Sequence, residues 1–282
     1  MFRIFGPPGT GKTTTLLDMV DKALEEGVHP HKIAYLAFTR KAANEARDRA
    51  AKRFNLDPKA DLPFFRTLHS LALAQSDIRV EQIMQPEDYK ELGDRIGYSF
   101  SSNQHRDIDN IADTVQTNDP DLNLINLARL RKVSLRKQYN VSEVDVDWTL
   151  VNFINHSLKS FKEKRNRYDF TDMLEAFSKT ADRYCPNFEI TFLDEAQDLS
   201  PLQWDIAHAL DKKSTRMYVA GDDDQAIFRW AGAEVDHFIN LDGGSEILSQ
   251  SFRIPKNVHE IARKVSNRLS NRFPKEYQPK KE

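Results

Sequence analysis

The chain has 282 residues, of which 39% are hydrophobic and 30% are charged, and its formal net charge is -2. This composition is typical of a soluble globular protein, and no apolar run approaches the roughly 20 residues of a membrane-spanning helix. The single cysteine, Cys185, excludes an internal disulfide and a zinc site built from thiolates, and we expect it to be buried. A glycine-rich motif already begins at residue 6, within the segment that a signal peptide would occupy, so we expect a cytoplasmic protein.

The first motif is a glycine-rich loop between a strand pattern and a helix pattern. Residues 1–5 have the sequence MFRIF, residues 6–15 have the sequence GPPGTGKTTT, and helical spacing continues to Gly27. The loop satisfies the pattern G-x-x-x-x-G-K-S/T in the context that the pattern requires. In such loops backbone N–H groups surround the phosphates, so we expect Lys12 to be catalytic and Thr13 to bind Mg²⁺. The residues expected to bind the nucleotide here are Gly6, Pro7, Pro8, Gly9, Thr10, Gly11, Lys12, Thr13 and Thr14.

Strand and helix patterns continue to alternate after the loop. Residues 32–38 (KIAYLAF) are nearly all apolar, as in a strand buried on both faces of a parallel sheet, and residues 40–54 have an alanine-rich helix pattern. Apolar strand patterns return at residues 188–198 and 215–225, each ending in several acids, and again at residues 245–253. The alternation predicts an α/β fold whose parallel sheet is flanked by helices.

The middle of the chain has a different character. Residues 76–167 are polar and helical in pattern, so we expect a mainly helical subdomain inserted into a core of residues 1–75 and 168–282. Residues 128–138 contain five Lys or Arg and no acid, and residues 159–167 contain five against one acid. Each run is either a solvated face or a nucleic-acid contact.

An acid pair follows the strand pattern of residues 188–193. We expect that strand to neighbour the strand of the phosphate loop, so that Asp194 holds Mg²⁺ beside Thr13. Glu195 would then orient and deprotonate the attacking water, which makes the site hydrolytic. The alternative is that the pair only marks a helix N-terminus, where acids are favoured.

Six sequence blocks in one order resemble the N-terminal half of a UvrD/Rep-type superfamily 1 DNA helicase. They match motifs I, Ia, Ib, II, III and IV of that family, and they lie at residues 6–15, 37–47, 66–72, 193–203, 219–233 and 248–255. The resemblance implies a RecA-like P-loop NTPase core that uses ATP and Mg²⁺. It also implies translocation from 3′ to 5′ along single-stranded DNA and unwinding of duplex junctions.

The resemblance also implies roles for individual residues. Gln225 matches the motif III glutamine that senses the γ-phosphate, and Arg253 matches the motif IV arginine that stabilises the transition state. Phe252 stands where the family usually has a tyrosine against adenine. The residues that match DNA-binding positions are Phe38, Thr39, Arg40, Asn44, Thr67, His69, Phe228 and Trp230. For Phe38 and His69 an interior position is the alternative.

The sequence departs from the family pattern in two places. In motif III the arginine, Arg229, precedes Trp230, whereas the family has it after the tryptophan. Motifs V and VI are absent, so we expect a second RecA-like lobe to be supplied by another chain or to have been lost by truncation.

Three functions remain as alternatives. The leading hypothesis is a DNA-dependent ATPase that forms one motor lobe of a helicase. The second is an ATP-gated module that binds single-stranded DNA without productive turnover by itself. A small P-loop kinase or an AAA+ ATPase does not explain the sequence GDDDQAIFRWAGA.

Overall fold

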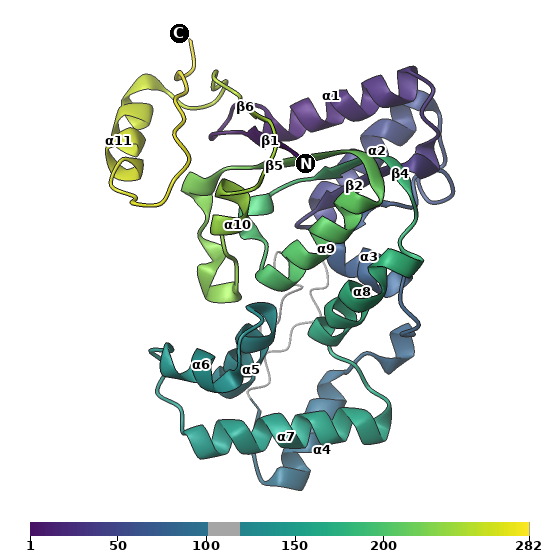
Figure 1. Cartoon of the computed structure of the whole chain (residues 1–282), viewed down its shortest axis with the longest axis vertical. Helices are drawn as coiled ribbons and strands as arrows, with labels where there is room; N and C mark the ends of the chain where they lie inside the picture. The colour runs from purple at the N-terminus through teal and green to yellow at the C-terminus, as the bar shows by residue number, and fades with distance from the viewer. Residues whose placement is uncertain (101–118, 282) are drawn as a thin grey trace.

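A computed structural model describes residues 1–100 and 119–281, and its core is one sheet of six parallel strands (Figure 1). The strand order is β3-β2-β4-β5-β1-β6. The strands are β1 (Phe2–Phe5), β2 (Ile33–Ala37), β3 (Phe65–Thr67), β4 (Phe188–Leu193), β5 (Ser214–Gly221) and β6 (Ser245–Ile247). The expected α/β fold with a parallel sheet flanked by helices is confirmed.

Helices cover both faces of the sheet because successive strand residues point to opposite sides. Tyr35 and Phe192 belong to an apolar cluster with α1 (Lys12–Glu25) and α2 (Arg40–Phe54). Leu36 and Leu193 belong to a second cluster on the other face. The helices of that face are α3 (Leu68–Ala74), α8 (Phe170–Tyr184), α9 (Pro201–Lys212) and the short α10 (Asp236–Ile239). All five residues of β2 are buried, which explains its almost wholly apolar sequence.

The segment expected to be an insertion, residues 76–167, contributes a helical layer of its own, seen below the sheet in Figure 1. Its helices are α4 (Pro86–Ile96), α5 (Pro120–Leu130), α6 (Leu135–Asn140) and α7 (Trp148–Arg165). They share a third apolar cluster that takes no residue from the sheet. The two ends of the insertion meet where the N–H of Met84 donates to the carbonyl of Tyr168 at 2.8 Å. Residues 101–118 of the expected insertion lie outside the described residues.

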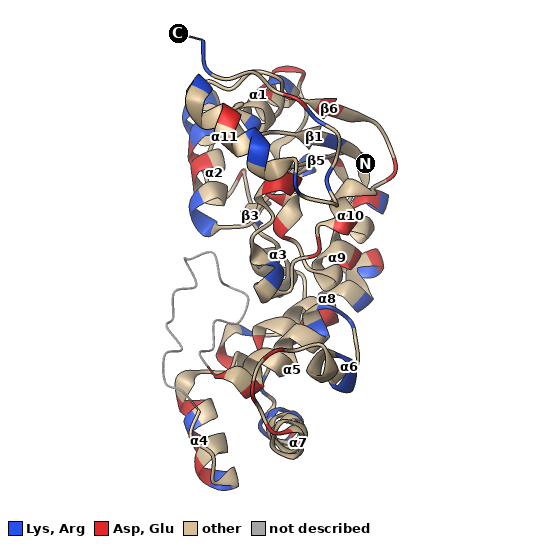
Figure 2. Cartoon of the chain, turned by 90° about the vertical axis from the view of Figure 1, so that its left-hand side faces the viewer, with Lys and Arg blue, Asp and Glu red and all other residues tan. Residues whose placement is uncertain are grey.

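Several cations of the two basic runs are paired with acids. Arg129 forms ion pairs with Asp169 at 2.8 Å and with Asp172 at 2.5 Å, and Lys162 pairs with the same two carboxylates. Figure 2 shows Lys and Arg interspersed with Asp and Glu along these helices. The runs therefore do not build one uniformly basic face.

Two expectations about the strands are wrong. The strand that precedes Asp194, β4, is not next to β1, because β5 pairs with both of them. The strand expected at residues 245–253 ends at Ile247. Beyond it, Ser249 and Ser251 hydrogen-bond Gln278 of the C-terminal segment instead of the sheet.

Cys185 is buried at the end of α8, as expected, and burial raises the pKa of its thiol to about 11. Among the described residues, no helix has both the length and the apolar character needed to span a bilayer.

Candidate functional site

The phosphate loop joins β1 to α1 at the carboxyl edge of the sheet. Gly9 and Gly11 have φ values of 71° and 82°, a region that favours glycine. Gly11 caps α1 without a side-chain hydrogen bond, so the first backbone N–H groups of the helix face the loop. A Cβ atom on Gly6 would lie 2.6 Å from the Cβ of Lys12. The glycines are therefore required for the loop to close around the lysine.

Four side chains from two distant motifs meet at this edge. The Nζ of Lys12 lies 2.5 Å from Oε2 of Glu195, and Oγ1 of Thr13 donates to Oδ2 of Asp194 at 3.1 Å. Burial raises the pKa of Asp194. Burial also acts to raise the pKa of Glu195, but the Lys12 ammonium outweighs it and holds that pKa below its ordinary value. The structure thus brings together the lysine, the hydroxyl and both acids of the expected site.

The oxygens of Thr13 and Asp194 fit a magnesium ion. Mg²⁺ usually takes one or two protein ligands and completes its shell with phosphate oxygens and water. Within residues 1–100 and 119–281, no group of three or more His, Cys, Asp or Glu could hold a metal ion by itself. Tyr35 also donates to Oδ2 of Asp194 at 3.1 Å and keeps this carboxylate in place.

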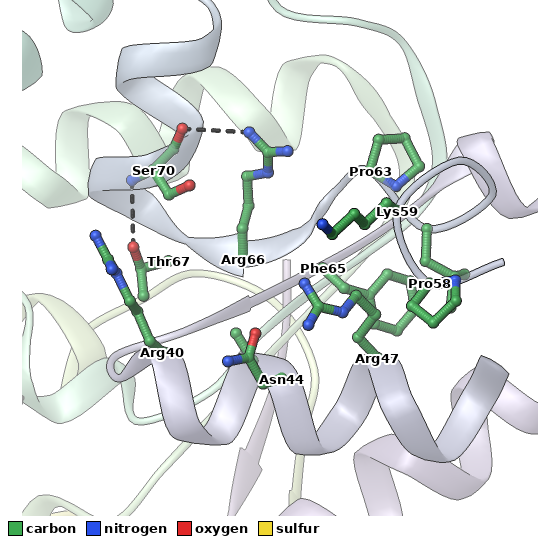
Figure 3. A pocket seen from close by; sticks show the side chains of 12 residues that line it. Arg40, Asn44, Arg47, Pro58, Lys59, Pro63, Phe65, Arg66, Thr67 and Ser70 are labelled. Atoms are coloured by element: carbon green, nitrogen blue, oxygen red, sulfur yellow. Dashed lines mark hydrogen bonds between the residues drawn. The ribbon is translucent and has the colours of Figure 1, made fainter. Parts of the chain in front are cut away.

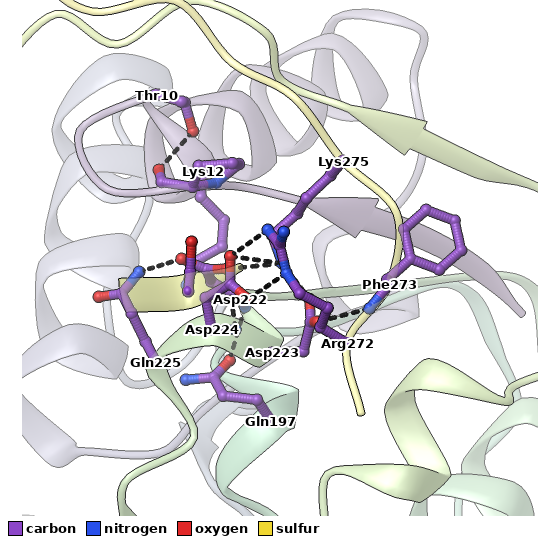
Figure 4. Close-up of polar contacts among 12 residues, drawn as sticks. Thr10, Lys12, Gln197, Asp222, Asp223, Asp224, Gln225, Arg272, Phe273 and Lys275 are labelled. Carbon is purple, nitrogen blue, oxygen red and sulfur yellow. Dashed lines mark hydrogen bonds and ion pairs between the residues drawn. The ribbon is translucent and has the colours of Figure 1, made fainter. Parts of the chain in front are cut away.

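A hydrogen-bond network connects Glu195 with motif III, and Figure 4 shows its members Gln197, Asp222 and Gln225. Gln197 donates to Oε2 of Glu195 at 2.9 Å and accepts from the N–H of Asp222 at 3.0 Å. Gln225 in turn donates to Oδ2 of Asp222 at 2.5 Å. Sequence reasoning missed Gln197 and Asp222, although both lie inside the motifs that it recognised.

The motif IV segment lies directly on the phosphate loop. The N–H of Phe252 donates to the carbonyl of Gly9 at 2.8 Å, and Ser251 Oγ donates to the carbonyl of Pro8 at 2.8 Å. A Cβ atom on Gly9 would lie 2.5 Å from the Cβ of Arg253. Phe252 is 69% exposed, so its apolar ring is accessible beside the phosphate loop.

Three aromatic residues of the expected DNA interface form a row. The ring centroids of Phe38 and Phe228 are 5.7 Å apart, and those of Phe228 and Trp230 are 6.1 Å apart. Trp230 is 54% exposed, while Phe38 and Phe228 are half-buried. Bases of single strands can stack on exposed aromatic side chains.

A basic pocket of about 180 Å³ lies beside the row, between α2 and the segment of β3 and α3 (Figure 3). Three of the expected residues, Arg40, Asn44 and Thr67, line it together with Arg47, Lys59 and Arg66. Burial lowers the pKa of Arg66, and the charge of Arg47 lowers it further. The Nε of Arg66 is buried and has no hydrogen-bond partner among the described residues. Sequence reasoning did not single out Arg47, Lys59 or Arg66, although Arg47 and Arg66 lie at the ends of the matched blocks 37–47 and 66–72.

Thr39, Thr67 and His69 of the expected set have local structural roles. Thr39 caps α2 by accepting from Ala42, and Thr67 caps α3 by accepting from Ser70. His69 is buried, and desolvation lowers its pKa to about 4. This position fits the alternative that His69 is an interior residue. Phe38, in contrast, is half-buried at one end of the aromatic row.

Comparison with known families agrees with this arrangement. Residues 2–244 match the sequence model of the UvrD/REP helicase N-terminal domain. The chain belongs to this family. The UvrD/REP assignment confirms the resemblance found in the six motifs and agrees with an ATP site at the carboxyl edge of a RecA-like sheet.

Three relatives are longer proteins that match this chain over part of their own length. The ATP-dependent DNA helicase PcrA of Leuconostoc citreum is 25% identical over 96% of this chain and 38% of its own length. PcrA of Bacillus subtilis (strain 168) is 25% identical over 95% of this chain and 37% of its own length. A probable DNA helicase II homolog of Mycoplasma capricolum is 24% identical over 92% of this chain and 38% of its own length. The chain thus spans well under half the length of the curated relatives it matches.

Proposed function

We propose that this chain is an ATPase lobe of a DNA helicase, which couples ATP hydrolysis to binding of, and movement along, single-stranded DNA. The observation that carries the proposal is the meeting of Lys12 and Thr13 with Asp194 and Glu195 at one edge of the sheet. A bare glycine turn does not explain it, because the two acids come from a motif 181 to 183 positions away in the sequence.

The nucleotide chemistry follows from the contacts around the phosphate loop. Lys12 is within reach of phosphates in the loop and would exchange its bond to Glu195 for them. Glu195 then acts as the base for the attacking water, and it keeps its hydrogen bond from Gln197. Arg253 and Gln225 would contact the γ-phosphate, and the Phe252 ring would stack on adenine.

The nucleic-acid chemistry uses the aromatic row and the basic pocket. Bases stack on Trp230 and its neighbours, and phosphates of the strand bind near Arg40 and Asn44. Phe38 and Arg40 are two positions apart in the sequence, so the two surfaces adjoin. The proposed contacts of Thr39, Thr67 and His69 have weaker support because these side chains cap helices or are buried.

We also propose that residues 1–75 and 168–282 form the RecA-like core and that residues 76–167 form an inserted subdomain. The separate apolar cluster of the insertion and the bridge between Ile83 and Tyr168 at its two ends support this division. The greater length of the relatives supports a second RecA-like lobe that completes the motor. A 3′ to 5′ polarity follows from the family resemblance alone, and a cytoplasmic location agrees with this role.

Steady ATP hydrolysis by the chain, with and without single-stranded DNA, tests the proposal. Lys12→Ala removes the phosphate-binding charge, whereas Lys41→Ala, on the exposed start of α2, is a matched control. We expect DNA-stimulated turnover in the wild type and the control but not in Lys12→Ala. ATP-dependent DNA binding without turnover would favour the alternative, an ATP-gated binding module. The absence of both would contradict the proposal.

A further inference from the structure

The C-terminal strap, residues 272–280, returns to the ATP site after α11 (Lys256–Ser266). The ring of Phe273 stacks on Phe5 of β1 with centroids 3.9 Å apart and planes 9° apart. Farther along, the N–H of Lys280 donates to the carbonyl of Ile254 at 2.8 Å. These two contacts hold the strap in place on both sides of the motif III acids.

Lys275 of the strap is the cation at the centre of these acids (Figure 4). Its Nζ lies 2.5 Å from Asp223, 3.1 Å from Asp224 and 3.3 Å from Asp222, and its side chain is 1% exposed. Three adjacent carboxylates buried together repel one another, so a buried cation is needed to hold them in one arrangement. Arg272 also binds this cluster, but it pairs with Asp224 alone.

Asp222 connects this cluster with the groups that act on ATP. Its carboxylate accepts from Gln225 at 2.5 Å, and its N–H donates to Gln197, which donates to Glu195 at 2.9 Å. Asp222 is therefore linked by hydrogen bonds to Gln225 directly and to Glu195 through Gln197.

We propose that Lys275 is a positioning residue for ATP hydrolysis, which holds Asp222 so that Gln225 and the Gln197–Glu195 pair face the γ-phosphate. The inference rests on the proposed function, since it assigns Gln225 and Glu195 their roles there. It makes the C-terminal strap a working part of the ATP site, although Lys275 lies 52 positions after Asp223 of motif III.

Lys275→Met tests the inference because it keeps the length of the side chain and removes its charge. We expect kcat for ATP to fall about ten- to a hundredfold, since misplaced catalytic groups carry losses of this size. KM should rise by less than kcat falls, because Lys12 and the backbone of the phosphate loop still bind the phosphates. Lys275→Arg should restore much of kcat.

Arg272→Met is the matched control, since it removes a cation from the same strap and the same cluster without touching Asp222. We expect a smaller loss of kcat than in Lys275→Met. Asp222→Asn keeps the shape of the side chain and weakens the contacts of Asp222, so it should reproduce the kcat loss even if Lys275→Met is too unstable to purify. The loss in the double variant Lys275→Met with Asp222→Asn should be less than additive.

Binding of fluorescent ATP and ADP analogues provides a readout that needs no turnover. The wild type should prefer ATP because Gln225 contacts the γ-phosphate, and Lys275→Met should lose this preference while its ADP affinity is kept. Wild-type kcat and wild-type ATP preference in Lys275→Met would overturn the inference while the proposed function stands. Equal losses in Arg272→Met and Lys275→Met, without rescue by Lys275→Arg, would also overturn it. A wild type that neither binds nor hydrolyses ATP would overturn the proposed function itself.

Discussion

The ammonium of Lys12 and the carboxylate of Glu195 form an ion pair at 2.5 Å across the mouth of the phosphate loop. The lysine side chain is 10% exposed and the glutamate side chain is 38% exposed, so the pair lies at the entrance of the site. An incoming triphosphate must compete with Glu195 for the lysine. The same contact lowers the pKa of Glu195 and so favours its ionised form.

Glu195→Gln should separate nucleotide binding from hydrolysis. The variant loses the base and frees Lys12, so we expect hydrolysis to fall at least about a hundredfold while ATP binding stays equal or becomes tighter. Single-turnover hydrolysis and titration with a fluorescent ATP analogue measure the two effects. Weaker ATP binding in this variant would contradict the competition between Glu195 and the phosphates.

Trp230→Ala should weaken binding to single-stranded DNA by about 1–3 kcal/mol, because it removes the exposed ring of the aromatic row. Phe153→Ala is the control, since Phe153 on α7 is 49% exposed, close to the 54% of Trp230. Fluorescence anisotropy with a labelled oligonucleotide gives both affinities. Equal effects of the two substitutions would remove Trp230 from the binding site.

Arg66→Met should weaken DNA binding and leave the folded protein equally or more stable. The guanidinium of Arg66 is half-buried near the like charge of Arg47, and its buried Nε has no partner among the described residues. We expect the slope of log affinity against log salt to fall by about one. Chemical denaturation measures the stability, and a salt titration measures the salt dependence of DNA binding. The exposed Lys52→Met is the control for both. A loss of stability with unchanged affinity would show that the pocket is not a phosphate site.

His69 should make the protein less stable in acid. Burial lowers its pKa from 6.5 to about 4, so between these values the unfolded chain binds a proton that the folded chain does not. Stability is therefore lost as the pH falls from about 6.5 to about 4, and the total approaches about 3 kcal/mol at about 1.4 kcal/mol per pKa unit. Urea denaturation across this range should give a flatter profile for His69→Asn than for the wild type, whereas the exposed His156→Asn should change nothing.

The sequence by itself determined the local elements and the identity of the nucleotide motif. Residues 40–54 form α2 with the bounds that the alanine-rich pattern predicts, and β2 falls within the apolar run of residues 32–38. Periodicity and glycine spacing are local properties, so they predict a strand, a loop or a helix without knowledge of the rest of the chain. The order of the six motifs was sufficient to identify the family.

Only the tertiary structure decided which distant segments meet. It placed β5 between β1 and β4, and it brought Lys275 to Asp222 and Arg66 to Arg47. Neither the pairing of strands nor the meeting of charges from separate elements leaves a periodic pattern in the sequence. They depend on how the helices and strands pack, because burial of the whole core selects one arrangement among many that the local patterns allow.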